Sequence, residues 1–390
     1  MTHVLLVVEN NSFPFDRRIA KEASSLREAG YSVSVICPAF GKDTLAYEKW
    51  QGIDVYRYRH YESKGGILGY VLEYSNAFIR ILLKAIRVFS ARPFKSIHVS
   101  NPPDFFWPMA LFFKLYGVKF IYDQHDIAPE MYRVNEQKEK NAIYRFLLWN
   151  EKNTLTIADG IITTNESIRN RAKEICNIKN KPDVVVYNGP ESDFRAIRDE
   201  AFLRKYTDKR VLLYLGEMAR VDCVDVIIDV ADQLLASHRY RDCKFVLLGD
   251  GPTRQNLIEM VQKKKLDAYF EFAGMVSKQL VMKYLGVSEL CLCPDKPNGL
   301  NEYLTLVKCL EYMKAARPFV AFSLEETRYV SGDSALYAEN LEEYVNHVRN
   351  LLDNPRMAQK LGESGLRRIE SKFLWEQQSV KLLKIYNELM

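Results

Sequence analysis

The chain has 390 residues, of which 47% are hydrophobic and 27% are charged, and its formal net charge is +5. A chain of this length exceeds one ordinary core and predicts two domains, and its globular composition excludes a disordered, collagen-like or repeat-built protein. The first residues have no basic region and no cleavage site, and no apolar stretch is long enough to cross a membrane, so we expect neither a signal peptide nor an anchor.

Cysteine usage predicts a reducing environment. The seven cysteines are an odd number, and most lie inside apolar strand or helix patterns. Reduced core cysteines have this distribution, and Cys291 and Cys293 are too close on one apparent strand to be metal ligands. We therefore expect a cytoplasmic protein.

Short apolar runs alternate with helical patterns through the first half of the chain, as in parallel α/β units. The segment 17–29 keeps Ile19, Ala23 and Leu26 on one face, which predicts a helix between the first two strands. The predicted strands are 3–8, 32–37, 53–57, 95–99, 118–123, 160–164 and 183–187.

The segment 80–95 predicts a basic amphipathic helix. No acidic residue lies between Glu73 and Asp104, and basic side chains such as Arg80 and Arg87 alternate with apolar ones. Such a helix can rest on an anionic membrane surface, and a core-packed helix with a solvated basic edge explains the pattern equally well. Nucleic acid is not an expected partner, because no recognition motif accompanies the charge.

The second half restarts the strand and helix alternation. Asn188-Gly189-Pro190 and the polar stretch after it predict a hinge, so we place domains at 1–190 and 191–370, with a final helix at 371–390. Doubly wound sheets bind ligands at the carboxyl ends of their strands. The predicted strands of this half are 211–215, 243–248, 269–273, 289–293 and 318–322.

The segment 294–313 has the residues of a diphosphate site. A strand ends in a turn-rich loop, Thr305 is expected to open a helix, and Lys308 and Glu311 follow in its next turns. A helix N-terminus and a lysine favour phosphate, and a glutamate can accept hydrogen bonds from ribose hydroxyls. A capped helix with Lys308 and Glu311 in solvent is the alternative from spacing alone.

This segment resembles the donor-binding region of the retaining family-4 glycosyltransferases of GT-B fold, and it is most similar to a bacterial surface-polysaccharide subgroup. The resemblance covers nearly the whole chain. It is carried by Phe13-Pro14-Phe15-Asp16-Arg17-Arg18, Asn101-Pro102-Pro103-Asp104, Asp123-Gln124-His125-Asp126, Gly249-Asp250-Gly251, Lys308 with Glu311-Tyr312-Met313, Leu324 to Arg328, and Trp375-Glu376.

The resemblance implies two facing Rossmann-like domains, an N-terminal one for the acceptor and a C-terminal one for the nucleotide-sugar donor, with a last helix that packs back on the first domain. His125 would face the transferred sugar. The implied donor contacts are Gly249, Gly251, Met275, Val276, Leu304, Thr305 and Glu311, and the implied acceptor contacts are Phe15, Arg17, Asp126 and Glu130.

The sequence departs from the family pattern at two places. Tyr303 stands where many relatives have the first of two glutamates, so we assign sugar recognition to the neighbouring Glu302. A lysine that relatives carry after the first strand of the second domain is missing, and Arg220 is the only cation of that region. We therefore predict that Arg220, with Lys308, reaches the phosphates.

No Asp-x-Asp pair is evident, so cations and a helix dipole would stabilise the leaving diphosphate, and we expect no metal and no cofactor. The resemblance implies transfer with retention to a cell-surface glycan or a lipid-linked precursor. We favour a UDP-sugar as donor, with a GDP-sugar second. A non-catalytic partner in a glycan-assembly complex and a UDP-sugar 2-epimerase are the alternatives.

Overall fold

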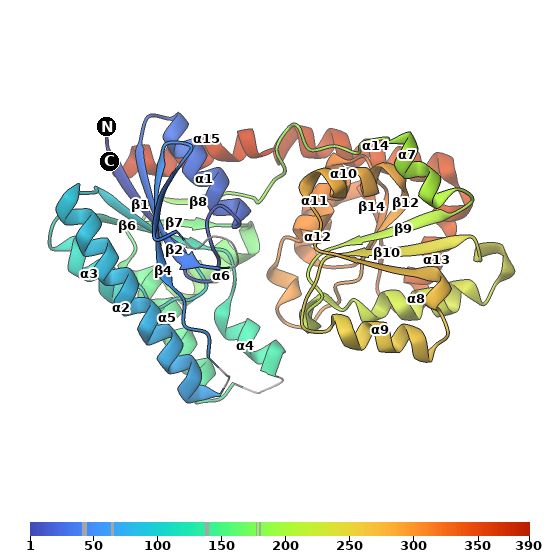
Figure 1. Cartoon of the computed structure of the whole chain (residues 1–390), viewed down its shortest axis with the longest axis horizontal. Coiled ribbons are helices and arrows are strands. Elements are labelled where there is room, and N and C mark those ends of the chain that lie inside the picture. Colours follow the sequence, from blue (N-terminus) through green and yellow to red (C-terminus); the bar gives the residue numbers. More distant parts are fainter. Residues whose placement is uncertain (41–44, 64–65, 137–139, 177, 179–180) are drawn as a thin grey trace. The chain divides into compact units, whose positions relative to one another are not determined.

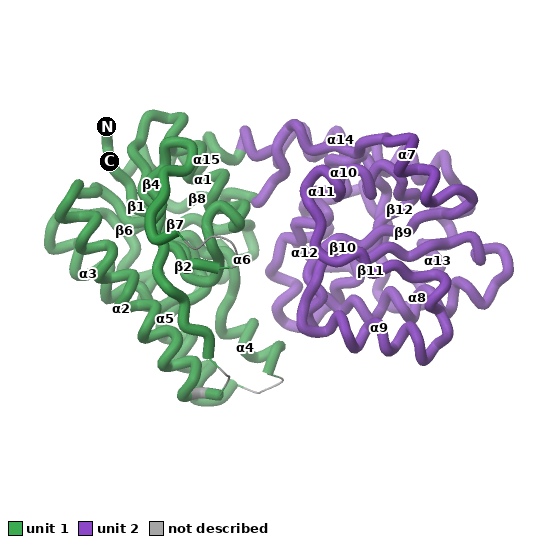
Figure 2. The backbone as a smooth tube through the Cα atoms, viewed as in Figure 1, with its two compact units in different colours: residues 1–187, 378–390 green, residues 188–377 purple. Residues whose placement is uncertain are grey.

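The computed structural model describes residues 1–40, 45–63, 66–136, 140–176, 178 and 181–390. It divides into two compact units, coloured differently in Figure 2: unit 1 comprises residues 1–187 and 378–390, and unit 2 comprises residues 188–377. The sequence had placed these boundaries at 190 and 370. In each unit, helices flank a largely parallel sheet (Figure 1).

The sheet of unit 1 has the strand order β3-β4-β2-β1-β5-β6-β7-β8. All of its pairings are parallel except β3 with β4, which is antiparallel. The strands are β1 (His3–Val7), β2 (Ser32–Ala39), β3 (Tyr47–Trp50), β4 (Ile53–Arg59), β5 (Ser96–Ser100), β6 (Lys119–Gln124), β7 (Gly160–Thr163) and β8 (Asp183–Val185).

The helices of unit 1 include a C-terminal one that is far away in sequence. The hydroxyl of Tyr386 in that helix is hydrogen-bonded to Nδ1 of His98 in β5 (2.6 Å). The side-chain oxygen of Gln378 accepts a hydrogen bond from the backbone N–H of Tyr187. The helices are α1 (Arg17–Glu28), α2 (Ile67–Ala91), α3 (Trp107–Lys114), α4 (Ala128–Glu136), α5 (Ala142–Ile157), α6 (Glu166–Ile175) and α15 (Trp375–Leu389).

Unit 2 has a fully parallel sheet of order β11-β10-β9-β12-β13-β14. Its strands are β9 (Arg210–Leu215), β10 (Cys243–Leu248), β11 (Phe270–Gly274), β12 (Ser288–Cys293), β13 (Phe319–Phe322) and β14 (Ala335–Ala338). Its helices are α7 (Glu200–Leu203), α8 (Asp225–Leu235), α9 (Arg254–Lys263), α10 (Lys278–Val287), α11 (Val307–Lys314), α12 (Glu325–Ser331), α13 (Leu341–Asp353) and α14 (Pro355–Lys372).

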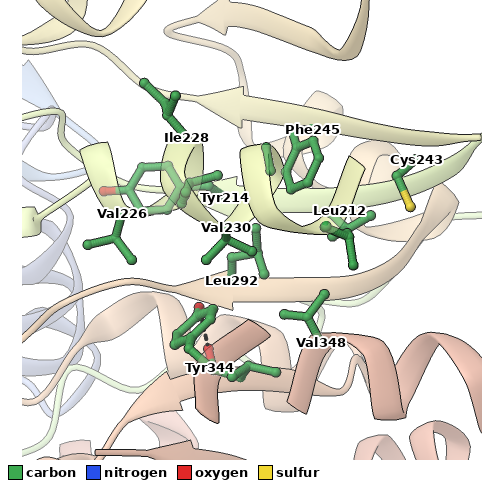
Figure 3. Close-up of a cluster of buried hydrophobic side chains, with 14 of the residues drawn as sticks. Leu212, Tyr214, Val226, Ile228, Val230, Cys243, Phe245, Leu292, Tyr344 and Val348 are labelled. Carbon is green, nitrogen blue, oxygen red and sulfur yellow. Dashed lines mark hydrogen bonds between the residues drawn. The ribbon is translucent and has the colours of Figure 1, made fainter. Parts of the chain in front are cut away.

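The core of unit 2 shows why near-continuous apolar runs become central strands. Parallel strands are covered on both faces, so their side chains are buried on both. Leu212 and Tyr214 of β9 pack with Val226 and Val230 of α8, and Tyr344 of α13 belongs to the same buried cluster (Figure 3). The Tyr344 hydroxyl donates to the carbonyl of Val320 (2.9 Å), so the buried ring keeps its polar atom satisfied.

The predicted fold class is confirmed, with two parallel-sheet Rossmann-like units and a C-terminal helix on the first. Every predicted strand forms, with ends that shift by a few residues. Two short strands were missed: β3, which lies at a sheet edge and alternates exposed with half-buried residues, and the four-residue β14. Among the described residues, no helix is both long and apolar enough to span a membrane.

Candidate functional site

In unit 1, three polar segments leave the carboxyl ends of neighbouring strands. They are the loop 9–15 after β1, the segment that starts with Asn101 after β5, and the segment that starts with His125 after β6. Because the strands are parallel, these ends lie on one edge of the sheet. The amide of Asn101 binds the third segment: its oxygen accepts from the backbone N–H groups of His125 (2.5 Å) and Asp126 (3.1 Å), and its nitrogen donates to the Asp126 carbonyl (2.7 Å).

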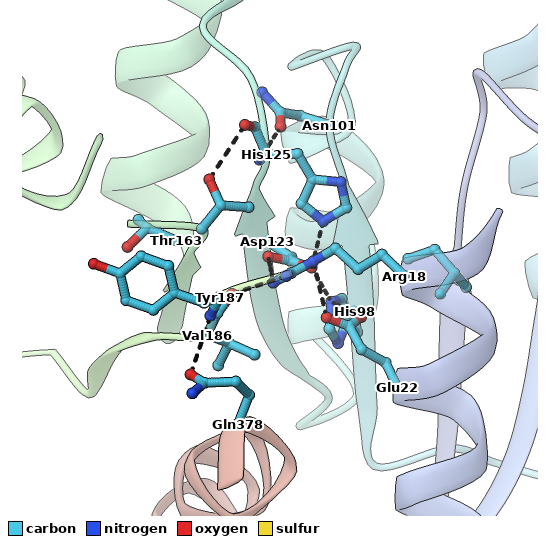
Figure 4. A network of polar contacts seen from close by, with 12 residues as sticks. Arg18, Glu22, His98, Asn101, Asp123, His125, Thr163, Val186, Tyr187 and Gln378 are labelled. Atoms are coloured by element: carbon cyan, nitrogen blue, oxygen red, sulfur yellow. Dashed lines mark hydrogen bonds and ion pairs between the residues drawn. The ribbon is translucent and has the colours of Figure 1, made fainter. Parts of the chain in front are cut away.

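A buried cation lies beneath these segments (Figure 4). The guanidinium of Arg18 in α1 donates to both carboxylate oxygens of Asp123 (3.0 and 2.9 Å) and to the carbonyl of Val186 (2.8 Å), and it is 3.1 Å from Glu22. Arg18 is 3% exposed, whereas its neighbour Arg17 is exposed. The fold therefore buries one of these two adjacent arginines and leaves the other at the surface.

The charges in this cluster are set by burial and by Arg18. Burial alone would raise the pKa of Asp123, but the charge of Arg18 outweighs it and holds that pKa well below its usual value. Burial, and then the charge of Asp123, raises the pKa of Glu22 well above its usual value. Burial lowers the pKa of His98. One buried cation thus faces one buried anion, Asp123, while Glu22 and His98 are held neutral. We call these residues, together with His125, the unit 1 network.

Both the side chain and the backbone of His125 are hydrogen-bonded. Its Nε2 lies 2.6 Å from a carboxylate oxygen of Asp123, and its backbone N–H donates to Asn101. Because Asp123 is kept ionised and can only accept, Nε2 carries the hydrogen. The other ring nitrogen, Nδ1, has no hydrogen bond to any described residue. A partly exposed imidazole in this tautomer can accept a hydrogen bond at Nδ1.

The other predicted acceptor residues of unit 1 differ in their surroundings. Phe15 is 61% exposed at the end of the loop 9–15. Glu130, in the first turn of α4, pairs with Arg133 (2.7 Å) and accepts from the hydroxyl of Tyr144 (2.7 Å). These hydrogen bonds outweigh the effect of burial and lower the pKa of Glu130. Glu130 is therefore an ionised group that already has partners within unit 1.

Within the described residues, side chains of metal-ligand type come together at Glu22, His98 and Asp123, where they belong to the unit 1 network. The guanidinium of Arg18 already supplies the positive charge that the two acidic side chains face. We interpret this group as an ion-pair cluster.

In unit 2, Lys308 stands at the start of α11 and is 8% exposed. Its ammonium lies 2.8 and 2.9 Å from the two oxygens of Asp295, which follows β12, and 3.4 Å from Asp222. It also lies over the ring of Tyr214, 5.1 Å from the centroid. The alternative that left Lys308 in solvent is wrong. We call Lys308, Asp295 and Asp222 the unit 2 network.

The ammonium of Lys308 is charged despite its burial. Burial alone would lower its pKa, but the charges of its partners, Asp295 first, hold that pKa well above the ordinary value. Burial raises the pKa of Asp222 to about 6, and the charge of Lys308 opposes this rise. The cluster therefore has one cation for two carboxyl groups, of which one titrates near neutral pH.

The loop before α11 differs from the prediction in one respect. The helix begins at Val307 with Leu306 at the N-cap position, so Thr305 does not open it. Leu306 is apolar and has no side-chain acceptor for the first N–H groups of α11. Glu302 turns back on its own loop and accepts from the backbone N–H groups of Asn298 (3.2 Å) and Gly299 (2.8 Å).

Gly249 and Gly251 serve the packing of unit 2 itself. The backbone at Gly249 has a φ of 125°, and a Cβ there would overlap the carbonyl oxygen of Gly216. A Cβ at Gly251 would lie 2.7 Å from the backbone of Met218. The glycines therefore let the loop after β10 approach the loop after β9, whether or not a nucleotide binds there.

The remaining predicted donor residues lie on loops at the carboxyl ends of the strands of unit 2 or close to them. Arg220 is exposed in a short 3-10 turn (Arg220–Asp222) after β9, and Met275 is 65% exposed after β11. Val276 and Leu304 are half-buried, and Glu311 is half-buried in the second turn of α11. Their predicted roles remain predictions.

Sequence reasoning missed the partners that hold the predicted residues. Arg18 lies within a recognised motif but received no role, and the others were not singled out as site residues: Glu22, His98, Asp222 and Asp295. An ionisable residue at a buried position of a helix or strand pattern was the available signal, as with Glu22 in α1 and His98 in β5. Asp222 and Asp295 gave no such signal, because both lie in loops rich in polar residues.

Two family models match the chain. The model described as "Glycosyltransferase Family 4" matches residues 16–194, and the one described as "Glycosyl transferases group 1" matches residues 209–354. The alpha-D-kanosaminyltransferase of Streptomyces kanamyceticus is 26% identical over 204 residues, which are 51% of each chain. The match thus spans about half the length of that relative.

Solved structures share the whole fold at low identity. A sucrose-phosphate synthase from Thermosynechococcus elongatus superposes with a TM-score of 0.79 at 15% identity, and the alignment covers 100% of this chain and 99% of that one. The HepE protein of Anabaena in complex with UDP superposes with a TM-score of 0.73 at 12% identity and covers 100% of both chains. At these identities the likeness shows the fold.

Proposed function

The chain belongs to the family-4 glycosyltransferases of GT-B fold, and from this premise we propose that it transfers a hexose from a nucleotide-sugar donor with retention and without a metal ion. Unit 2 would bind the donor and unit 1 the acceptor. The bond between sugar and phosphate would break with its electron pair moving to the diphosphate oxygen. The acceptor hydroxyl would form the new bond on the same face of the sugar and pass its proton to the departing phosphate.

The observation that carries the proposal is the buried, charged Lys308 in the first turn of α11. A departing diphosphate gains negative charge, and a fixed cation at a helix N-terminus stabilises that charge without reorganising at the moment of reaction. Glu311, one turn further along, would accept hydrogen bonds from the ribose. Arg220, exposed on the turn that also carries Asp222, would add a second cation.

In unit 1, His125 is the proposed partner of the transferred sugar. Its ring is fixed by Asp123 and its Nδ1 has no hydrogen bond to a described residue, which suits an imidazole that accepts a hydrogen bond from a sugar hydroxyl. Phe15, Arg17, Asp126 and Glu130 would contact the acceptor. Glu302 would recognise the donor sugar only after releasing the backbone of its own loop.

We propose a UDP-sugar as donor and a cell-surface glycan or lipid-linked precursor as acceptor. A solved structure of the same fold contains UDP, which supports the choice of base, and a GDP-sugar is the rival. The proposal also places the enzyme in the cytoplasm, at the inner face of the plasma membrane, where the basic face of residues 80–95 would meet anionic lipid.

A thermal-shift screen with UDP, GDP, ADP, TDP and CMP, each with and without EDTA, tests the donor site. A ligand that prefers the folded state raises the midpoint by mass action. We expect UDP to stabilise the protein, with or without EDTA, and Lys308→Ala and Glu311→Ala to abolish the shift. Lys314→Ala is the matched control, because it removes a lysine from the other end of the same helix.

Two results would redirect the proposal. Stabilisation that EDTA removes would contradict metal-independent binding. Stabilisation by UDP without sugar transfer to any acceptor would favour the non-catalytic partner in a glycan-assembly complex, for which Tyr303 in place of a family glutamate is the motivation. Conversion of one UDP-sugar into another without an acceptor would identify a 2-epimerase.

A further inference from the structure

Three helices of unit 1 expose large apolar side chains. Seven lie on α2, and the others lie on α3, directly after it, and on α5. These side chains are Leu68, Tyr70, Val71, Leu72, Tyr74, Ile79 and Leu83, then Leu111, Phe112, Leu115 and Tyr116, and finally Phe146 and Trp149. A soluble surface rarely exposes so many large apolar groups in one region, and such a region indicates a binding surface.

Ring contacts join the three helices into one surface. Phe89 of α2 packs against Phe113 of α3 with ring centroids 5.5 Å apart, and Trp107 of α3 packs edge-on against Trp149 of α5, also at 5.5 Å. Figure 1 shows these helices within unit 1. We call the exposed side of α2, α3 and α5, with residues 115–119, the three-helix face.

The charge of this face has one sign. In the ranges 68–91, 107–119 and 142–157, the acidic residues are Glu73, which is 16% exposed and lies 3.5 Å from the ring of His60, and Glu151, which is 0% exposed. The face therefore presents no exposed carboxylate within these described ranges. Its exposed cations are Arg80, Arg87, Lys119, Arg145 and Lys152, and three more exposed cations flank its helices: Arg92, Lys95 and Lys140.

Apolar and basic side chains alternate on the same side of α2. Ile79, Leu83 and Arg87 follow one another at a spacing of four residues and are all exposed, as is Arg80, while Ile81 is buried in the core of unit 1. The core-packing alternative is thus correct for the inner side of the helix. On the outer side of α2, Ile79 and Leu83 are exposed to solvent next to Arg87.

We propose that the three-helix face docks on a bilayer that contains anionic phospholipid. The apolar side chains would enter the boundary between headgroups and acyl chains, where tryptophan and tyrosine are favoured, and the arginines and lysines would meet lipid phosphates. Uniform positive charge around an apolar centre is complementary to such a surface. This deepens the membrane location that is part of the proposed function, because it assigns the contact to three helices instead of residues 80–95.

A vesicle co-sedimentation experiment with the full chain tests the charge contribution. We compare vesicles of phosphatidylglycerol mixed with phosphatidylcholine against vesicles of phosphatidylcholine alone, at low and high salt. The face should bind the mixed vesicles and lose binding as salt screens the charges. Each basic residue near an anionic surface contributes about fivefold, or ~1 kcal/mol, so the triple variant Arg80→Ala, Arg87→Ala, Arg145→Ala should bind roughly a hundredfold more weakly.

The matched control removes the same charge from exposed positions of α14 in unit 2. The control substitutions are Arg356→Ala, Lys360→Ala and Arg367→Ala. This variant should bind vesicles like the unchanged protein. Equal losses in both triple variants would mean that only the overall charge matters, and would overturn the proposal.

A second variant tests the apolar contribution. Ile79→Ser, Leu83→Ser and Leu115→Ser lie at 56%, 52% and 83% exposed positions, so they should leave the fold intact. We expect at least a tenfold loss of binding to mixed vesicles. The shift of the thermal midpoint by UDP, measured on each variant, separates this proposal from the proposed function, because the donor site is in unit 2. Unchanged vesicle binding, or self-association that these serines abolish without any vesicle binding, would overturn it.

Discussion

The two units hold the carboxyl ends of their strands together by different means. In unit 1 the ends are joined by buried side chains: Arg18 binds Asp123 and the carbonyl of Val186, and Asn101 binds the segment of His125. In unit 2 the main chain does much of this work, because Gly216 donates to Leu248 (3.1 Å) and Met218 donates to Asp250 (2.8 Å). Glycine at position 249 makes the close approach possible.

The difference matters for what each edge can recognise. The side-chain hydrogen bonds of unit 1 hold the imidazole of His125 in one tautomer, which suits a group that faces a reacting sugar. The backbone hydrogen bonds of unit 2 hold short loops at the strand ends, beside the unit 2 network. The two buried cations differ in the same way: Arg18 has one ionised partner and a carbonyl, whereas Lys308 shares its charge between two carboxyl groups.

The largest expected effect is the loss of Arg18. Arg18→Met leaves the carboxylate of Asp123 buried without its cation, and breaking a buried pair in this way costs about 3–5 kcal/mol. We expect urea denaturation to show this loss and hydrogen exchange to locate it in unit 1, with amides of unit 2 unaffected. Arg17→Met, at an exposed position on the same helix, should change stability by less than about 0.5 kcal/mol. Equal effects of the two substitutions would contradict the structural role of Arg18.

The second largest loss of stability is expected for the substitution of Gly249 in unit 2. Gly249→Ala introduces a Cβ that overlaps the Gly216 carbonyl and also strains a positive φ, so it should cost about 3 kcal/mol. Gly274→Ala separates the two causes: its φ is 70°, but nothing lies within 4 Å of the new Cβ, so about 1 kcal/mol of strain remains. Thermal and urea unfolding of both variants measure the difference, and similar losses would mean that strain alone explains the glycine.

Removal of the Asn101 amide should have a smaller effect on unit 1. Asn101→Ala leaves the part-buried N–H groups of His125 and Asp126 without their acceptor, which we expect to cost about 2 kcal/mol. Hydrogen exchange should become faster after β6 and stay unchanged in unit 2. Asn10→Ala, at an exposed position of the neighbouring loop, is the control. No change in exchange after β6 would show that Asp123 alone positions His125.

The smallest expected effect is the pH dependence of unit 2. Burial raises the folded-state pKa of Asp222 to about 6 from its ordinary value of 3.8. Its contribution to stability is therefore fully present below pH 3.8 and is lost as the pH rises through about 6. Ionised Asp222 also competes with a diphosphate for Lys308. UDP-glucose should therefore bind about tenfold (~1.4 kcal/mol) more tightly near pH 5 than near pH 8.

Asp222→Asn should remove this dependence, giving tight binding at both pH values and a gain in stability over the unchanged protein near pH 8. UDP-glucose is the suitable probe because its diphosphate does not titrate in this range. Asp250→Asn, at a carboxylate that is 60% exposed on the loop after β10, is the control. A variant that keeps the full pH dependence would assign it to another group.

The sequence singled out candidate site residues but little of their charge balance. His125 and Lys308 were chosen because each lies in a recognisable motif beyond the end of a strand, and the helix after Asp16 was predicted from its apolar spacing. Glu302 was assigned to sugar recognition by position, yet its carboxylate caps its own loop. The start of α11 was placed two residues early, because Thr305 is a good capping residue and Leu306, at the observed cap, is not.

By itself, the sequence determined the two α/β units, the order of most strands along the chain and the family, because apolar periodicity and motifs are local features. Only the tertiary structure decided which charges are buried and what they face. Arg18 and Asp123 are 105 residues apart, and Lys308 and Asp222 are 86 apart. Such pairs leave no periodic trace in the sequence, since they form only where folding brings strand ends together and removes water from the charges.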